Sequence, residues 1–370
     1  MTVYLEVFAI AAVATYLFCF PVRRLAVTLG AIVQPDENRV HEKPMPTVGG
    51  AAMYVGFLIA LGVASLIPSL KPVFSTSEPM GVALGATVIF AVGVVDDLRE
   101  LSPPGKLAGT VLASSILYFL GVTLFYFRIP FAGFVVLGPD VTPLLTALWV
   151  AVMSNAINLI DGLDGLAAGI VTIASGAFFV YSWRLHDLGL LTPDNVGLLV
   201  AAATCGICVG FLPHNFHPGK IMMGDAGALM LGLLMAASTM SVGGQTANDF
   251  HFSGETYFFF APLFIPFVIL GVPMVDSIFA VFRRLARRGQ WHARDKEHLH
   301  HRLMRLGHGH LRSVVILWIW TAILSGLVLY PTLNLPGSGS ANAIIPFGIL
   351  ALAVALYTLF HPGLRQRSNT

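Results

Sequence analysis

The richest polar segment of this chain is an Asn/Asp run that reads Asn155-Ala-Ile-Asn158-Leu-Ile-Asp161-Gly-Leu-Asp164-Gly165. It follows directly on a strongly apolar stretch. A carboxylate next to hydrocarbon costs ~2.5 kcal/mol or more on insertion scales, so acids in such places are usually there for a purpose. The run therefore predicts that this part of the chain binds a charged ligand.

The spacing of this run predicts a corner in the chain. Its polar residues recur every three positions, so on a helix of 3.6 residues per turn each would be rotated by about 60° from the previous one. A single straight helix cannot aim all four inward. Because a glycine follows each acid, we expect Asn155 and Asn158 to end one helix and Asp161 and Asp164 to open the next.

Four further polar motifs accompany the run. They contain Lys43 in the segment 41–50, the pair Asp96-Asp97 followed by Lys106, Lys220 and Asp225 in the segment 215–225, and His298, His300 and His301 in the segment 295–302. Carboxylate and amide oxygens suit Mg²⁺ or Mn²⁺, and lysines supply point charges for phosphate. Together they indicate a metal-bound phosphate or pyrophosphate substrate.

Each motif alone also has a simpler interpretation. Asp225 could be the N-cap of a helix, and Asp96 and Asp97 could end a membrane helix as solvated charges. His298 and His301 are i, i+3 neighbours that could bind zinc, but zinc needs three or four converging ligands and no thiolate is near. We therefore favour these histidines as hydrogen-bond donors to a phosphorylated substrate.

The composition predicts an all-α integral membrane protein, because 56% of the 370 residues are apolar and only 11% are charged, against about 25% charged in soluble domains. Runs of roughly 17 to 25 residues can span a bilayer. About eleven can be placed, the two at 80–96 and 142–158 being the shortest: 3–22, 48–70, 80–96, 106–123, 142–158, 163–183, 196–212, 224–242, 257–282, 313–331 and 341–360.

Charge predicts how these spans are oriented. With the N-terminus outside, all but Lys71, Arg128 and Arg184 of the 21 basic residues fall in inside loops, as the positive-inside rule requires. The polar motifs and the C-terminus are then cytoplasmic. Topology explains the basic clusters, and no nucleic-acid module accompanies them, so we expect no nucleic-acid partner.

The chain reads as one polytopic membrane domain over 1–370. Residues 122–141 predict a small extracytoplasmic β-hairpin around a Pro/Gly turn, and residues 283–312 a cytoplasmic loop rich in His and Arg. Three prolines within 257–282 predict a kinked helix, whose groove could take a lipid tail.

At these motifs the chain resembles the polyprenyl-phosphate N-acetylhexosamine-1-phosphate transferases, glycosyltransferase family 4. The resemblance covers about residues 35–312 and rests on Lys-Pro-x-Pro-Thr-x-Gly-Gly, Asp96-Asp97, the Asn/Asp run, Met-Gly-Asp225 and His298-Leu-His300-His301. The peptidoglycan translocase branch usually has three consecutive His instead. The match therefore favours the branch that uses simple UDP-N-acetylhexosamines, with UDP-GlcNAc the first expectation and phospho-MurNAc-pentapeptide transfer the alternative.

The resemblance implies transfer of N-acetylhexosamine 1-phosphate from the UDP-sugar to undecaprenyl phosphate in the bacterial cytoplasmic membrane, which releases UMP and starts a cell-envelope glycan. It implies Asp225 as a ligand of Mg²⁺, or Mn²⁺, assisted by Asn158 or Asp161. Catalysis and the lipid phosphate would fall to Asp96, Asp97, Lys106 and Asp161. Substrate-binding residues would be Lys43, Asn155, Asp164, Arg283, Arg284, His298, His300 and His301. Whether the protein is a homodimer stays open.

An ion-coupled membrane transporter is the rival from another class. Transporters place ionisable residues and broken helices near the bilayer midplane, often within inverted repeats. Here the acids fall at predicted helix ends, and no inverted repeat can be aligned. A CDP-alcohol phosphotransferase would need an Arg after Asp-Gly, which the segment after Asp164 lacks.

Overall fold

The computed structural model of the chain describes residues 1–33, 44–124, 126–129, 133–243, 271, 303–304, 306–333 and 341–360. The predicted span at 257–282, except Gly271, and most of the loop at 283–312 lie outside the described residues. So do six predicted substrate-binding residues, namely Lys43, Arg283, Arg284, His298, His300 and His301.

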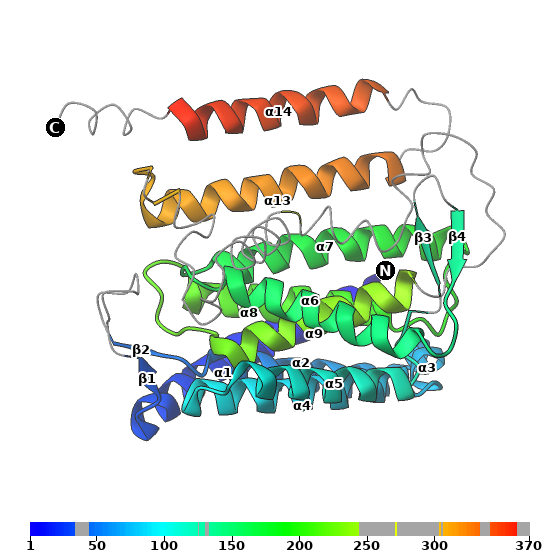
Figure 1. The fold of residues 1–370 in the computed structure, drawn as a ribbon, viewed down its shortest axis with the longest axis horizontal. Helices are drawn as coiled ribbons and strands as arrows, with labels where there is room; N and C mark the ends of the chain where they lie inside the picture. The colour runs from blue at the N-terminus through cyan, green and yellow to red at the C-terminus, as the bar shows by residue number, and fades with distance from the viewer. Residues whose placement is uncertain are drawn as a thin grey trace.

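The described part is a bundle of long helices with two short antiparallel hairpins (Figure 1). Its elements are α1 Thr2–Leu29, β1 Ile32–Val33, β2 Met45–Pro46, α2 Gly49–Leu66, η1 Pro68–Leu70, α3 Lys71–Phe74, α4 Glu78–Arg99, α5 Pro103–Phe119, β3 Tyr126–Ile129, β4 Gly133–Val136, α6 Thr142–Ile160, α7 Leu166–Asp187, α8 Gly197–Asn215, α9 Gly224–Gly243, α13 Gly309–Leu333 and α14 Ala341–Phe360.

Helices occupy ten of the eleven predicted spans, and the eleventh is the span outside the described residues. Eight of these helices are long and apolar enough to cross a membrane, which confirms the all-α membrane class. The expectation that 80–96 and 142–158 are the shortest spans is wrong: α4 has 22 residues and α6 has 19, whereas α5 has 17. The apolar run of α4 ends before Asp96, but its helical hydrogen bonds continue to Arg99.

Helix α9 is the central helix of the described bundle. Every residue of its apolar window is buried, and it packs against α2, α4, α6 and α8. Small residues allow these close approaches: a Cβ added at Gly93 of α4 would lie 2.3 Å from the Cα of Ala226, and one at Gly232 would lie 2.3 Å from the Cα of Ser154. Close backbone contact of this kind is a common way for helices to associate in membranes.

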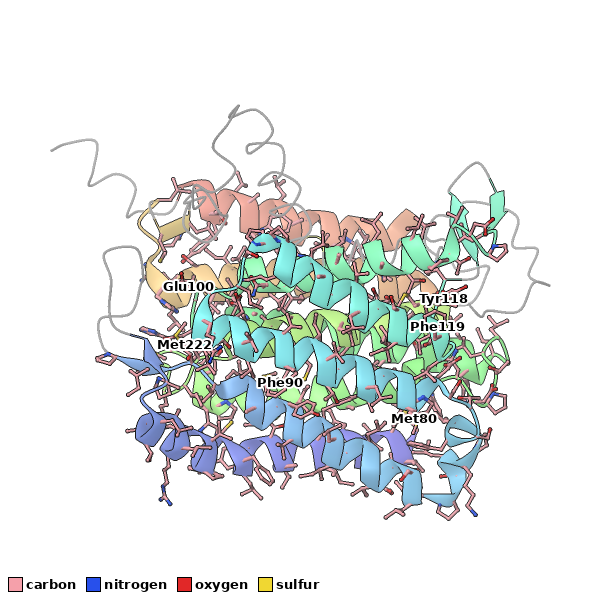
Figure 2. All side chains as sticks on the ribbon, turned by 60° about the horizontal axis from the view of Figure 1, so that its bottom comes forward. Met80, Phe90, Glu100, Tyr118, Phe119 and Met222 are labelled. Atoms are coloured by element: carbon pink, nitrogen blue, oxygen red, sulfur yellow. The ribbon has the colours of Figure 1, made fainter. Side chains whose placement is uncertain are left out.

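The polar connections gather at one end of the bundle. Figure 2 places Glu100, after α4, and Met222, before α9, at the same end, with Met80 and Phe119 at the opposite end. The β1–β2 hairpin joins this polar end, because the Met222 N–H donates to the Pro46 carbonyl at 2.8 Å. The predicted hairpin within 122–141 is confirmed as β3–β4 and lies at the far end (Figure 1).

The α1–α8 interface offers a test of this packing. A Cβ at Gly210 would lie 2.1 Å from the carbonyl oxygen of Ala12, whereas one at Gly62 of α2 would meet nothing within 4 Å. Alanine is a better helix former than glycine by about 1 kcal/mol. We expect Gly210→Ala to lower the thermal unfolding midpoint in detergent by several degrees and the matched Gly62→Ala to leave it unchanged or slightly raised. Equal midpoints for the two variants would contradict the described α1–α8 contact.

Candidate active site at the polar end of the bundle

Asp97, near the end of α4, caps the N-terminus of α9. Its Oδ1 accepts the backbone N–H of Asp225 at 2.9 Å, and its Oδ2 accepts that of Ala226 at 3.2 Å. A carboxylate here satisfies two N–H groups that have no partner within the helix and complements the helix dipole. The interpretation of Asp225 as the N-cap of its own helix is therefore wrong, because a neighbouring helix supplies the capping carboxylate.

Gly224 allows Asp97 this close approach. Its φ of +69° favours glycine, and a Cβ there would lie 2.4 Å from the Thr47 carbonyl oxygen and 2.5 Å from Oδ2 of Asp97. The Gly-Asp pair at 224–225 thus has a physical reason: the glycine lets α4 and the segment before α2 reach the start of α9, and the acid after it is held in the first turn.

Lys106 of α5 links Asp96 and Asp225. Its Nζ forms an ion pair with Oδ2 of Asp96 and a second, at 2.9 Å, with Oδ2 of Asp225. The Asp96 side chain is only 5% exposed, whereas Lys106 and Asp225 are 37% and 32% exposed, so a ligand can reach the latter two. Oδ1 of Asp96 also accepts the Leu101 N–H at 2.7 Å. Asp96 is thus not a solvated helix-end charge.

Asn158 and Asp161 reach the same group of side chains. The Asn158 side chain lies close enough to the Asp225 carboxylate to stabilise its charged form. Asp161 follows the last residue of α6, and burial together with the charges of Asp225, Asp97 and Asp164 raises its pKa to about 8. The polar end thus holds Asp96, Asp97 and Asp225 against the single ammonium of Lys106, and this excess of acids is the electrostatic condition for binding a further cation.

The predicted corner after α6 is confirmed, with one difference. Helix α6 ends at Ile160 and α7 begins at Leu166, so Asp161 and Asp164 lie in the turn between the helices rather than opening the second one. Asn155 is exposed and donates back to the Ala151 carbonyl at 2.7 Å. Its amide is thus turned along its own helix, and the described contacts do not bring it to the carboxylates.

Asp164 organises the loop between α8 and α9. Its side chain is 4% exposed, and its Oδ2 accepts the Gly219 N–H at 3.0 Å and pairs with Nδ1 of His217 at 3.2 Å. Asn215 closes the same corner: it accepts the Gly165 N–H at 2.9 Å and donates to the Ile221 carbonyl at 3.0 Å. The turn after α6 and the loop before α9 are therefore one hydrogen-bonded unit.

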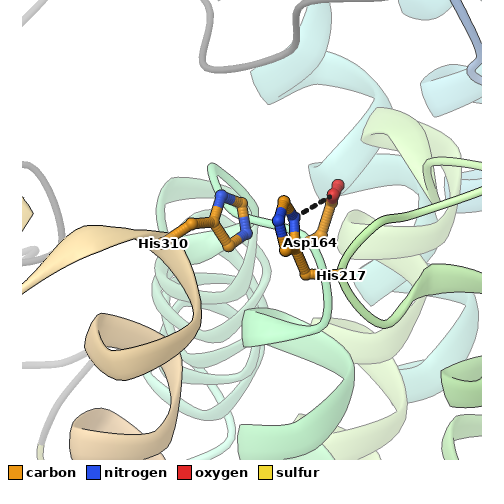
Figure 3. A group of neighbouring side chains, drawn as sticks. All are labelled: Asp164, His217 and His310. Carbon is orange, nitrogen blue, oxygen red and sulfur yellow. Dashed lines mark hydrogen bonds and ion pairs between the residues drawn. The ribbon is translucent and has the colours of Figure 1, made fainter.

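A histidine pair extends from Asp164 toward α13 (Figure 3). The His217 and His310 rings stack with centroids 4.3 Å apart and an interplanar angle of 22°. One ligand atom from each of Asp164, His217 and His310 lies within 4.8 Å of the others, but in-plane nitrogens of stacked rings cannot both point at one ion without a ring rotation. Sequence reasoning did not single out His310; the repeated Gly-His at 307–310 is the signal that could have done so.

Within the described part of the chain, the sequence-predicted residues thus divide into two sets. The structure brings together Asp96, Asp97, Lys106, Asn158, Asp161 and Asp225, and it places Asp164 beside them. It turns Asn155 elsewhere, and Lys220 is exposed, with its backbone N–H donating to the His214 carbonyl at 2.8 Å. The combination of oxygen ligands with a reachable ammonium can bind a divalent cation and phosphate oxygens.

The capping role of Asp97 can be tested by its effect on stability. An amide offers one acceptor oxygen and turns an NH₂ group toward a backbone N–H, and losing a helix cap costs about 0.5–2 kcal/mol. We expect Asp97→Asn to lower the thermal unfolding midpoint. The matched variant Asp225→Asn should change it much less, because that side chain is a third exposed and Lys106 keeps Asp96 as a partner. Equal losses in the two variants would refute the capping role.

Comparison with known proteins agrees with the geometry. The family model described as "Glycosyl transferase family 4" matches residues 79–243 of the chain. Decaprenyl-phosphate N-acetylglucosaminephosphotransferase of Mycobacterium tuberculosis is 38% identical, covering 85% of this chain and 79% of that protein. A probable undecaprenyl-phosphate N-acetylglucosaminyl 1-phosphate transferase of Bacillus subtilis is 36% identical, covering 85% and 82%. Phospho-N-acetylmuramoyl-pentapeptide-transferase of Mycolicibacterium smegmatis is 30% identical, covering 81% and 88%. The chain belongs to glycosyl transferase family 4, nearer to the N-acetylglucosamine-phosphotransferases than to the pentapeptide transferases.

Proposed function

We propose that this protein transfers N-acetylglucosamine 1-phosphate from UDP-N-acetylglucosamine to a polyprenyl phosphate and releases UMP. Family membership supports the reaction class, since the relatives named above carry this activity in their names. The observation that carries the proposal is the convergence of Asp96, Asp225 and Lys106, with Asn158 and Asp161, at one end of a membrane helix bundle.

Asp225, Asn158 and Asp161 would hold Mg²⁺, or Mn²⁺ in its place. The residues fit the ion in two respects: they offer the oxygen ligands that Mg²⁺ prefers, and a cation, the Lys106 ammonium, already pairs with Asp225. When bound, Mg²⁺ neutralises charge on the pyrophosphate oxygens and on the departing UMP.

In the proposed reaction an oxygen of the acceptor phosphate attacks the β-phosphorus of UDP-N-acetylglucosamine. The bond from that phosphorus to the oxygen bridging to the α-phosphate breaks, and UMP leaves with this oxygen. A phosphate monoester has its second pKa near ~6, so the acceptor is largely dianionic at neutral pH and needs no base. Catalysis then consists of alignment and charge neutralisation, to which Lys106 contributes its ammonium.

Asp97 acts in this scheme as a positioning residue. Both of its oxygens accept backbone N–H groups of α9, and these hydrogen bonds stabilise the carboxylate and make its oxygens weaker nucleophiles and weaker bases. A covalent phosphate on Asp97 or proton abstraction by it is therefore disfavoured. The carboxylate instead fixes the first turn of α9 and, with it, the direction of the Asp225 side chain.

The donor nucleotide is assigned to the Asp164 side of the site. Asp164 and Asn215 hold the turn after α6 to the loop before α9, and this unit adjoins the proposed metal ligands. Lys43, Arg283, Arg284, His298, His300 and His301 stay sequence-based predictions for substrate binding. We also propose that the polar end faces the cytoplasm of a bacterium with the N-terminus outside, on the strength of the positive-inside charge distribution.

The proposal predicts that purified protein releases UMP from UDP-N-acetylglucosamine only when a polyprenyl phosphate and Mg²⁺ or Mn²⁺ are present. Asp225→Asn should reduce the rate at least about a hundred-fold, a loss typical of removing one electrostatic catalytic group. Asp187→Asn is the matched control, because Asp187 ends α7 and pairs with Arg184 on the surface; its rate should equal that of the wild type.

Wild-type turnover that survives thorough EDTA treatment would rule out the metal role. A donor panel of UDP-N-acetylglucosamine, UDP-N-acetylgalactosamine and UDP-MurNAc-pentapeptide separates this function from the translocase alternative, which predicts UMP release from the last donor alone. Solute uptake into proteoliposomes without any UMP release would instead support the transporter.

A further inference from the structure

Lys106 occupies a place that a divalent cation would need. Its Nζ pairs with Oδ2 of Asp96 and with Oδ2 of Asp225, and the Asn158 side chain lies close to Asp225. An ammonium group and a divalent ion cannot share the same carboxylate oxygen without strong repulsion between them. A cation that binds Oδ2 of Asp225 therefore competes with the Lys106 ammonium for that oxygen.

The two carboxylates do not depend on Lys106 for their positions. Asp96 is held by the hydrogen bond from the Leu101 N–H at 2.7 Å. Asp225 stands in the first turn of α9, whose backbone Asp97 fixes. Departure of the Lys106 side chain would thus leave the carboxylates in place and exposed to the incoming cation.

The ammonium of Lys106 can move, whereas its backbone is held in place. Its backbone lies in the first turn of α5, where its N–H donates to the Ser102 carbonyl at 3.1 Å and its carbonyl accepts the Thr110 hydroxyl at 2.9 Å. The side chain is 37% exposed and has four rotatable bonds, so the ammonium can move while the helix stays fixed.

We propose that Lys106 is a cation surrogate: it neutralises Asp96 and Asp225 before the metal binds, and metal binding to Asp225 releases its ammonium to a phosphate group of a substrate. This inference rests on the proposed metal-dependent function and deepens it. The surrogate keeps the carboxylates from repelling one another in the unloaded protein, and its release supplies a positive charge only when the metal is in place.

The exchange predicts opposite changes in two affinities. Lys106→Gln should bind Mn²⁺ about ten-fold more tightly than the wild type in the absence of substrates, measured from the loss of the free Mn²⁺ signal in electron paramagnetic resonance; a ten-fold change corresponds to about 1.4 kcal/mol. Arg99→Gln is the matched control, since Arg99 is an exposed cation in the last turn of α4, and its Mn²⁺ affinity should stay within about two-fold of the wild type, as for a solvent-screened charge.

Lys106→Gln loaded with Mn²⁺ should bind phosphate ligands at least about ten-fold more weakly than the wild type. A loss of this size is expected when one charge-assisted hydrogen bond to the ligand is removed. Farnesyl phosphate and UDP serve as the two probes: a loss confined to the first assigns Lys106 to the acceptor phosphate, and a loss confined to the second assigns it to the donor diphosphate.

Three outcomes would overturn the exchange. Unchanged or weaker Mn²⁺ binding by Lys106→Gln would show that the lysine only supports the structure, and an increase matched by Arg99→Gln would show a general charge effect. Unchanged affinity for both phosphate probes would refute the release step. In each case the proposed reaction stands if wild-type protein binds Mn²⁺ and turns over; if no variant and no wild-type protein binds Mn²⁺, the metal-dependent function fails as well.

Discussion

The site depends on the carboxylate of Asp97, which holds the N-terminus of α9 through two backbone hydrogen bonds. Helix α9 is the buried centre of the described bundle, so the end that Asp97 fixes is also the point where α2, α4 and α6 can meet. Gly224 makes the approach possible, and the Asp225 side chain is thereby set at the surface of the polar end. Removing this cap would disturb the site without touching any group that contacts substrate.

Charge balance explains the rest of the site. Carboxylates from α4, α9 and the turn after α6 converge, and burial with their mutual repulsion raises the pKa of Asp161 to about 8. Lys106 offsets part of this charge, and a divalent ion with substrate phosphates would offset the remainder. The second cluster, formed by Asp164, His217 and His310, is different in kind, because its acid is already engaged by a backbone N–H and its imidazoles are stacked. It joins α13 to the loop before α9.

Much of the architecture could be predicted because hydrocarbon imposes a simple pattern: apolar runs of bilayer length marked ten helices, and the three-residue spacing after Asn155 marked the corner. The composition of the motifs also identified the residues that converge at the site: Asp96, Asp97, Lys106, Asn158, Asp161 and Asp225. What could not be predicted was which partner each polar group takes. The acceptor that caps α9 is 128 residues away in sequence, and neither local spacing nor helix propensity reports such a contact. Asn155 shows the same limit, since its type suggested a ligand and its helix face turns it away.

The most direct test of the account is an anomalous-scattering map of crystals soaked in Mn²⁺. The proposed metal exchange at Asp225 predicts a peak about 2.1 Å from a carboxylate oxygen of that residue, at the distance expected for an oxygen ligand of a small divalent ion, together with a Lys106 side chain that no longer pairs with that oxygen. A peak at Asp164, His217 and His310 with none at Asp225 would contradict it.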